Sequence, residues 1–182
     1  MTGVQTCALP IFEDLAIYQV GAGNLSGGDE PQRIVSISIS HSFFDTLGVP
    51  PAMGRTFNPD DEAEGAPVVI LSDELWRSNF GARQDVLGET VLMDSESVEI
   101  VGVMPPGLNF PPTEAGLYEP MTLNPNAPSQ LGSLGTNSVG RLFPGMTPQE
   151  AGAHLAARID NLADVFPDEP AAPILPPAGR AA

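Results

Sequence analysis

The pattern of hydrophobic and polar positions predicts short strands spread along the chain. Residues 33–40, RIVSISIS, alternate apolar and polar side chains, which is typical of a strand with one buried face. Residues 68–71, VVIL, form a short apolar run that predicts a buried strand. Residues 89–93 and 98–104 flank the polar segment DSES and predict a β-hairpin. Further strands are expected at 12–20 (where a short helix before the strand is the alternative), 117–123 and 137–143.

Other segments have the spacing of a helix with one apolar face. Their expected boundaries are Ser40 or Ser42 to Gly48, Ser72 to Gly81, and Thr147 to about Val165. The corresponding apolar faces contain Phe43, Phe44 and Leu47; Leu75, Trp76 and Phe80; and Ala151, Leu155, Ile159 and Leu162. The last helix has the clearest signal, because TPQE forms a capping box with proline at the first helical position.

The segments between these elements are rich in turn residues. Residues 21–31, GAGNLSGGDEP, predict a loop or hairpin connection, and residues 58–67, NPDDEAEGAP, predict a charged loop. Residues 49–57 are expected to be extended because successive prolines exclude a helix. Residues 107–136 predict a long irregular segment around one short strand. The whole pattern predicts an α+β fold with a mixed sheet covered on one side.

The charge balance excludes several classes of partner. The chain has 23 acidic residues against 7 basic ones, all arginine, and a net charge of −16. Such a surface repels phosphate backbones and anionic membranes, so we expect no nucleic-acid partner. We interpret the acidity as a solvated surface, and the alternative is a docking face for a basic partner. A hydrophobic content of 42% is sufficient for a packed core.

The two ends of the chain are interpreted separately. Residues 1–11, MTGVQTCALPI, read like the in-frame translation of a sequencing adapter, so we exclude them from the fold and expect a truncated gene fragment. Cys7 is then not native; the alternative is a genuine N-terminus with one odd cysteine. The Pro/Ala-rich residues 166–182 are expected to be disordered. No run of about 18 apolar residues is present, so we expect no transmembrane segment within the chain.

Few residues have the spacing that chemistry requires. His41 and His154 lack the H-x-x-x-H spacing of a zinc site, and we interpret both as surface or boundary residues. Ser40 beside His41 could belong to a hydrolase triad, but the chain has no G-x-S-x-G elbow. The densest acidic run lacks EF-hand spacing and is interpreted as a solvated loop. It contains Asp60, Asp61, Glu62 and Glu64.

Nucleotide chemistry is not expected either. The glycines at 21–28 do not form a P-loop or a Rossmann fingerprint, and the chain has no lysine. The aromatic residues on helix faces are interpreted as core, with ligand stacking as the alternative. They are Phe43, Phe44, Trp76 and Phe80. We therefore assign no catalytic, cofactor-binding or metal-ligating residue, and we expect neither a cofactor nor enzyme activity.

Four motifs in this order resemble the MacB-like periplasmic core domain of ABC-transporter permeases of the MacB/FtsX class. They are SFFDTLGVPPAMGRTF, VVILSDELWRSNFG, VLGETVLMDSESVEIVGVMPPGLNFP and RLFPGMTPQEAGAHLAARI. The resemblance covers residues 12–165. It implies a porter-like α/β lobe with a mixed sheet and a smaller, β-rich inserted lobe, to which we assign residues 66–136. In such a fold Gly54 and Arg55 would shape the turn into Phe57.

The resemblance also implies a location and a function. The domain would lie outside the cytoplasmic membrane, between the first two transmembrane helices of a permease. It would couple conformational change, driven by a separate ATP-binding subunit or domain, to substrate export or partner binding. Its expected partners are the membrane helices of the same permease, that ATP-binding component and a periplasmic partner protein.

Two other functions remain open from the sequence. A free-standing secreted module could bind a peptide or a sugar through residues 107–136. An enzyme could use a carboxylate pair at Asp60 and Asp61.

Overall fold

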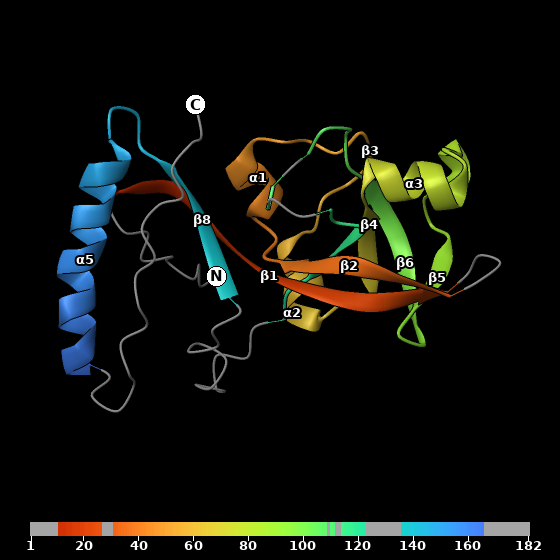
Figure 1. The fold of residues 1–182 in the computed structure, drawn as a ribbon, viewed down its shortest axis with the longest axis horizontal. Helices are drawn as coiled ribbons and strands as arrows, with labels where there is room; N and C mark the ends of the chain where they lie inside the picture. Colours follow the sequence, from red (N-terminus) through yellow and green to blue (C-terminus); the bar gives the residue numbers. More distant parts are fainter. Residues whose placement is uncertain (1–10, 27–30, 109, 112–113, 123–135, 166–182) are drawn as a thin grey trace.

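A computed structural model describes residues 11–26, 31–108, 110–111, 114–122 and 136–165, and from residue 157 onward it describes the backbone alone. The expectations for residues 1–10, 123–135 and 166–182 lie outside this described part. The strands are β1 (Phe12–Ser26), β2 (Gln32–Ile39), β3 (Met53–Gly54), β4 (Val68–Leu71), β5 (Thr90–Met93), β6 (Glu96–Val103), β7 (Leu117–Pro120) and β8 (Thr136–Leu142) (Figure 1). The helices are α1 (Phe43–Leu47), α2 (Pro59–Glu64), α3 (Asp73–Phe80), the 3₁₀ helix η1 (Gln84–Val86) and α5 (Pro148–Val165).

The strands form one mixed, eight-stranded sheet whose pairings close on themselves. β1 pairs with β2, β2 with β7, β7 with β4, β4 with β6, β6 with β5, and β5 returns to β1. The last link is narrow, since it consists of the pairs Leu25–Met93 and Ser26–Leu92. We call this circuit the barrel; β3 and β8 lie outside it, on β6 and β1. The predicted α+β class with a mixed sheet is confirmed, whereas the closure of the circuit was not predicted.

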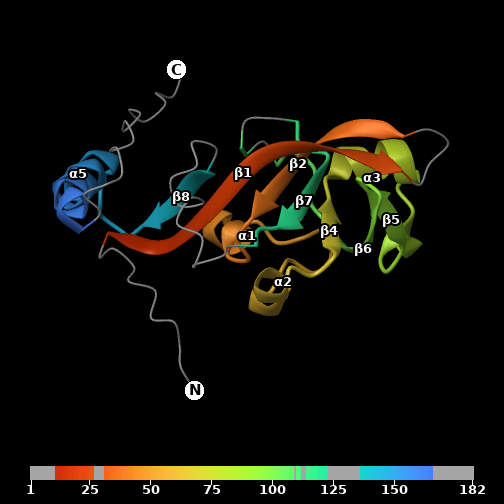
Figure 2. The ribbon, with the colours of Figure 1, turned by 90° about the horizontal axis from the view of Figure 1, so that it is seen from below.

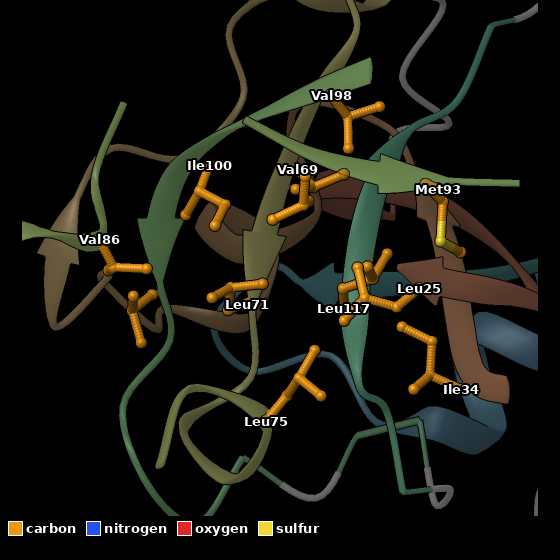
Figure 3. Packing of buried hydrophobic residues seen from close by; sticks show 12 residues of the cluster. Leu25, Ile34, Val69, Leu71, Leu75, Val86, Met93, Val98, Ile100 and Leu117 are labelled. Atoms are coloured by element: carbon orange, nitrogen blue, oxygen red, sulfur yellow. The ribbon is translucent and has the colours of Figure 1, made fainter. Parts of the chain in front are cut away.

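Alternate residues of the barrel strands contribute side chains to two separate hydrophobic clusters, because successive side chains of a strand point to opposite faces. The first cluster gathers side chains from all the barrel strands together with Leu75 of α3 and Val86 of η1 (Figure 3). Its other members are Leu25, Ile34, Val69, Leu71, Val91, Met93, Val98, Ile100, Val103 and Leu117. The second cluster lies on the opposite face and contains Ala16, Ile37, Ile39, Phe43, Phe44, Phe57, Ile70, Met104 and Tyr118.

The aromatic residues predicted to be core divide between these clusters. Phe43 and Phe44 of α1 are 0% and 1% exposed, and their rings meet edge to face in the second cluster. Trp76 and Phe80 of α3 pack against the first cluster but remain partly exposed. The indole Nε1 of Trp76 donates to the carbonyl oxygen of Arg83 at 2.8 Å, which fixes the turn after α3. The core interpretation is therefore confirmed most fully for α1.

β1 is the longest strand and extends from β8, outside the barrel, into the barrel itself (Figures 1 and 2). Residues 12–19 pair with β8, and residues 18–25 pair with β2. Residues 21–31 were predicted to be a loop or a hairpin connection. A loop from residue 21 is wrong, since the strand continues to Ser26, whereas the hairpin alternative agrees with the antiparallel pairing of β1 and β2. Its glycines favour a loop locally, but the ladder with β2 supplies hydrogen-bond partners that the sequence does not reveal. Gly23 also leaves space that the side chain of Met93 occupies.

The predicted charged loop at 58–67 is also wrong, because it contains α2. The Asn58 side chain accepts hydrogen bonds from the backbone amides of Asp60 and Asp61, and the Asp61 carboxylate accepts one from the amide of Asn58. This is a reciprocal capping box, with proline at the first helical position. Gly65 ends the helix at a φ of +60°. The segment lacks an apolar stripe, so hydrophobic periodicity could not reveal this helix.

The other helix ends follow the predictions closely. Gly48 and Gly81 end α1 and α3 in the left-handed conformation, and the Ser72 hydroxyl accepts from the amide of Leu75 at 3.2 Å. The Thr147–Glu150 capping box precedes α5. One detail differs: Ser42 occupies the N-cap position before α1, but its hydroxyl donates to the carbonyl oxygen of Leu15 and makes no capping hydrogen bond.

Candidate functional site

The candidate site lies where several strand ends meet. β4 and β6 are parallel neighbours, so their carboxyl ends reach the same edge of the barrel. α3 starts immediately after β4, the chain leaves β6 through Met104 and Pro105, and β7 begins beside them because it is antiparallel to β4. In sheets that contain parallel strands, such carboxyl edges are the usual place for a ligand.

Two adjoining cavities, of about 350 and 250 Å³, form a groove at this edge. They share Ser72, Glu74, Glu114 and Ala115. The larger cavity is lined in addition by Asp73, Met104, Pro105, Pro106, Gly107, Leu108 and Tyr118. The smaller one is lined by residues at the start of β2, including Arg33, and by Leu75 and Ser78 of α3. We call the two cavities together the groove.

Backbone hydrogen bonds hold the groove in shape. The amide of Ser72 donates to the carbonyl oxygen of Gly116 at 2.9 Å, and the amide of Gly116 donates to Val35 at 2.9 Å. The amide of Met104 donates to the carbonyl oxygen of Leu71 at 2.9 Å. These bonds join β4, β2 and the two segments that border the groove. The lining is therefore fixed by the sheet itself.

The lining combines an apolar floor with an acidic rim. Met104 and Tyr118 are each 1% exposed, and burial raises the pKa of Tyr118 to about 12, so its hydroxyl stays neutral at physiological pH. Asp73 is paired with Arg77, whose Nε lies 2.8 Å from its carboxylate. Glu74 and Glu114 are exposed at the rim. Within the described lining, the larger cavity contains no basic side chain.

The two histidines do not meet. The Nδ1 of His41 lies 2.6 Å from a carboxylate oxygen of Glu62, which also accepts a hydrogen bond from the His41 amide at 2.9 Å. This contact ties the start of α1 to α2. His154 is exposed on α5, next to Glu150. Across the described residues, no group of three or more His, Cys, Asp or Glu side chains is placed to hold a metal ion.

Within the acidic run that includes Asp60 and Asp61, the carboxylate of Asp61 has a structural role. Asp61 is 6% exposed and receives two hydrogen bonds from the guanidinium of Arg55. Burial by itself raises the pKa of Asp61, but hydrogen bonds from Arg55 and Asn58 outweigh it and lower the pKa. Asp60 is exposed at the start of α2. The Ser40 hydroxyl oxygen likewise accepts a hydrogen bond from the amide of Ile17, at 3.1 Å.

The chain matches one known protein family over most of its length. The model of the MacB-like periplasmic core domain matches residues 3–159. The chain belongs to this family. It is thus a periplasmic domain of the kind found in MacB-like permeases, and no described helix is long and apolar enough to cross a membrane.

Individual relatives agree with the family assignment. The MacB-like domain is 32% identical over 65 residues to a macrolide export ATP-binding/permease protein MacB of Burkholderia thailandensis, an alignment that covers 36% of this chain and 10% of the relative. It is 34% identical over 68 residues to the corresponding protein of Sodalis glossinidius, covering 37% of this chain and 10% of that one. The chain therefore matches a small part of these curated relatives.

A solved structure shows the same fold. The extracellular domain of the noncanonic ABC-type transporter YknZ from Gram-positive bacteria superposes with a TM-score of 0.65 at 19% identity, covering 90% of the MacB-like domain and 81% of that chain. The expectations of a periplasmic location and of this family are confirmed.

One partly buried acid of the MacB-like domain was not identified from the sequence. Glu119 of β7 has one carboxylate oxygen, Oε1, that is buried without a hydrogen-bond partner among the described residues. Burial raises the pKa of this carboxyl; a hydrogen bond with Ser36 opposes the rise, and the charge of Asp94 adds to it. A glutamate between Tyr118 and Pro120 in a predicted strand was the available signal, but the sequence did not show which face of the strand is enclosed.

Proposed function

We propose that this MacB-like domain is a non-catalytic coupling module of an ABC-transporter permease. In this proposal, a separate ATP-binding subunit or domain drives the membrane helices of the permease, and the domain passes the resulting movement to export or to a periplasmic partner protein. Family membership supports the permease context, and the side-chain arrangement supports a mechanical rather than a chemical role. Of the residues considered for catalysis, Ser40 is hydrogen-bonded to β1, His41 to α2 and Asp61 to Arg55, whereas Asp60 is exposed.

The observation that carries the proposal is the continuity of β1. Its first half pairs with β8 and contributes Ala16 to the second cluster, while its second half pairs with β2 and contributes Leu25 to the first. Residues 19–22 between them are exposed. Tyr18 and Gln19 are flanked by both partner strands. A hydrogen-bonded strand transmits displacement along its length, so β1 can link motion at the β8 end to the barrel.

The coupling role is tested by interrupting β1 in the complete permease. Two glycines inserted between Gln19 and Val20 leave residues 12–19 opposite β8 and residues 20–25 opposite β2, but they interrupt the ladder at Tyr18 and Gln19, where both partner strands meet, and so remove the rigid connection. We expect transport by the reconstituted permease to be lost while ATP hydrolysis continues, because movement of the membrane helices is then no longer passed to the barrel. Transport and ATPase rates are measured in the same proteoliposomes.

The control is the same insertion between Arg83 and Gln84, which lie outside the barrel strands. This position is exposed, so the insertion should leave transport nearly unchanged. Circular dichroism confirms that both variants fold. Retained transport after the β1 insertion would refute the coupling proposal.

The free-standing module that the sequence left open is disfavoured by the family match. The groove nevertheless borders the segment considered for binding, since Gly107, Leu108 and Glu114 line it. A binding role for this edge is therefore compatible with a domain that works within a permease.

A further inference from the structure

We propose that the groove between α3 and the segment after β6 binds a basic, amphipathic peptide segment of a periplasmic partner. The inference rests on the proposed function, because it names the chemistry of the partner to which the domain is coupled. Binding of such a segment involves no covalent chemistry. It depends on the shape, the apolar floor and the charge of the groove, which together match one class of ligand.

The shape fits a pair of side chains rather than a large ligand. The larger cavity, of about 350 Å³, is at the lower end of the roughly 300–1,000 Å³ typical of binding pockets. The smaller cavity continues it along α3 toward the start of β2. Two adjoining depressions that share Glu74 and Glu114 suit an extended segment with one side chain in each.

The floor provides the apolar half of the match. Met104 and Tyr118, each 1% exposed, lie beneath its base, so the apolar surface open to a ligand is the wall formed by Leu108 and the prolines at 105 and 106. Proline side chains lose little conformational entropy when a ligand contacts them. A leucine-like side chain of a partner would therefore displace water from a surface that is already ordered.

The rim provides the charge. The first turn of α3 contains two carboxylates, Asp73 and Glu74, which oppose the usual attraction of a helix N-terminus for an anion. Arg77 is paired with Asp73, so the net negative charge of this turn is that of Glu74. Glu74 and Glu114 flank the larger cavity, and no ion pair is shown for either among the described residues. The net charge of −16 further favours the approach of a cation. Arg33 borders the smaller cavity, which places the cationic end of the ligand at the larger one.

The test measures peptide binding by the full 182-residue chain. The probe is a fluorescein-labelled hexapeptide, Gly-Leu-Arg-Gly-Leu-Arg, followed by fluorescence anisotropy at 20 and 150 mM salt. Comparison peptides carry Glu in place of Arg, or Ser in place of Leu. We expect binding of the first peptide, weaker binding at the higher salt, and loss of affinity for both comparison peptides.

Matched variants locate the binding site. Glu74→Gln/Glu114→Gln should weaken binding about fivefold, because two exposed ion pairs are removed. Glu64→Gln/Glu96→Gln makes the same change in net charge at exposed positions away from the groove and should leave affinity unchanged. In ¹⁵N–¹H spectra the peptide should shift the amide signals of Glu74, Ala115 and Tyr118.

Several outcomes would overturn the proposal. Equal weakening by both double variants would show general charge attraction, and equal binding of the Glu-containing peptide would assign the groove to an apolar ligand. No effect of the groove variant would exclude this site. Since the permease is absent from these measurements, a failure here leaves the β1 insertion experiment unaffected, and a failure of coupling leaves peptide binding measurable.

Discussion

Arg55 and Asp61 form a bidentate pair that joins the end of β3 to the first turn of α2. The guanidinium donates to both carboxylate oxygens, and the second of these bonds, from Nη2 to Oδ1, is 3.1 Å long. The same carboxylate accepts from the amide of Asn58 at 2.8 Å. One side chain thus closes the capping box and anchors the preceding turn, where Gly54 adopts a φ of +73°. This arrangement agrees with the predicted role of Gly54 and Arg55 in the turn.

We therefore expect Asp61→Ala to lower the free energy of unfolding by about 2 kcal/mol, because it removes a helix cap and leaves Arg55 without its partner. Urea denaturation followed by circular dichroism measures the change. The neighbouring Asp60→Ala should cost well under half as much, since Asp60 is exposed. Equal losses in the two variants would contradict the assigned role of Asp61.

Glu119 should make the stability of the domain depend on pH. Burial raises the pKa of its carboxyl in the folded state above that of the unfolded chain, so the folded state binds the proton more tightly. The contribution to stability is fully present below about pH 4.3, the usual value for an unfolded glutamate, and is lost as pH rises through the raised pKa.

Glu119→Gln tests this pH dependence, because the amide keeps the shape and removes the charge. We expect the variant to be more stable than the parent at pH 7, and the difference to shrink as the pH falls to 4. Urea denaturation over that range measures the two curves. Glu99→Gln, at an exposed position of β6, is the control and should show no such pH-dependent difference from the parent. Parallel curves for Glu119→Gln and the parent would refute the prediction.

Gly102 faces Gly54 across the β3–β6 pair, and a larger residue does not fit there. A Cβ on Gly102 would lie 2.4 Å from the carbonyl oxygen of Arg55, which is backbone and cannot rotate away. Gly102→Ala should therefore destabilise the domain by about 1–3 kcal/mol. Gly152→Ala in α5 should have the opposite sign and stabilise by up to about 1 kcal/mol, because nothing lies within 4 Å of the added carbon. Thermal unfolding of both variants gives the comparison.

Phe44 joins α1 to β7, since its ring meets that of Tyr118 edge to face with centroids 5.0 Å apart. Removing this fully buried ring leaves a cavity in the second cluster. We expect Phe44→Ala to cost about 3–5 kcal/mol. Phe143→Ala is the control at a position that is 44% exposed, and its effect should be below about 1 kcal/mol. Chemical denaturation measures both, and a small effect at Phe44 would show that α1 is not anchored as described.

Patterns of residues close together in the sequence were sufficient to predict many of the helices and strands. The alternation in RIVSISIS, the Ser72 and Thr147 caps and the glycines at 48 and 81 predicted elements that the structure contains, because each signal depends on residues a few positions apart. The same signals carried the family resemblance. Helix α2 also has a local cap, but its polar composition gave no periodicity to support it.

Tertiary structure decided what depends on distant partners. The extension of β1 through Gly21 and Gly23 follows from its ladder with β2, and the closing of the barrel depends on Leu25 meeting Met93. The groove exists because the carboxyl ends of β4 and β6 meet the start of β7 at one edge, which brings Glu74 and Glu114 together there. These are contacts between segments far apart in the chain, and no local pattern of hydrophobic and polar residues specifies which strands become neighbours.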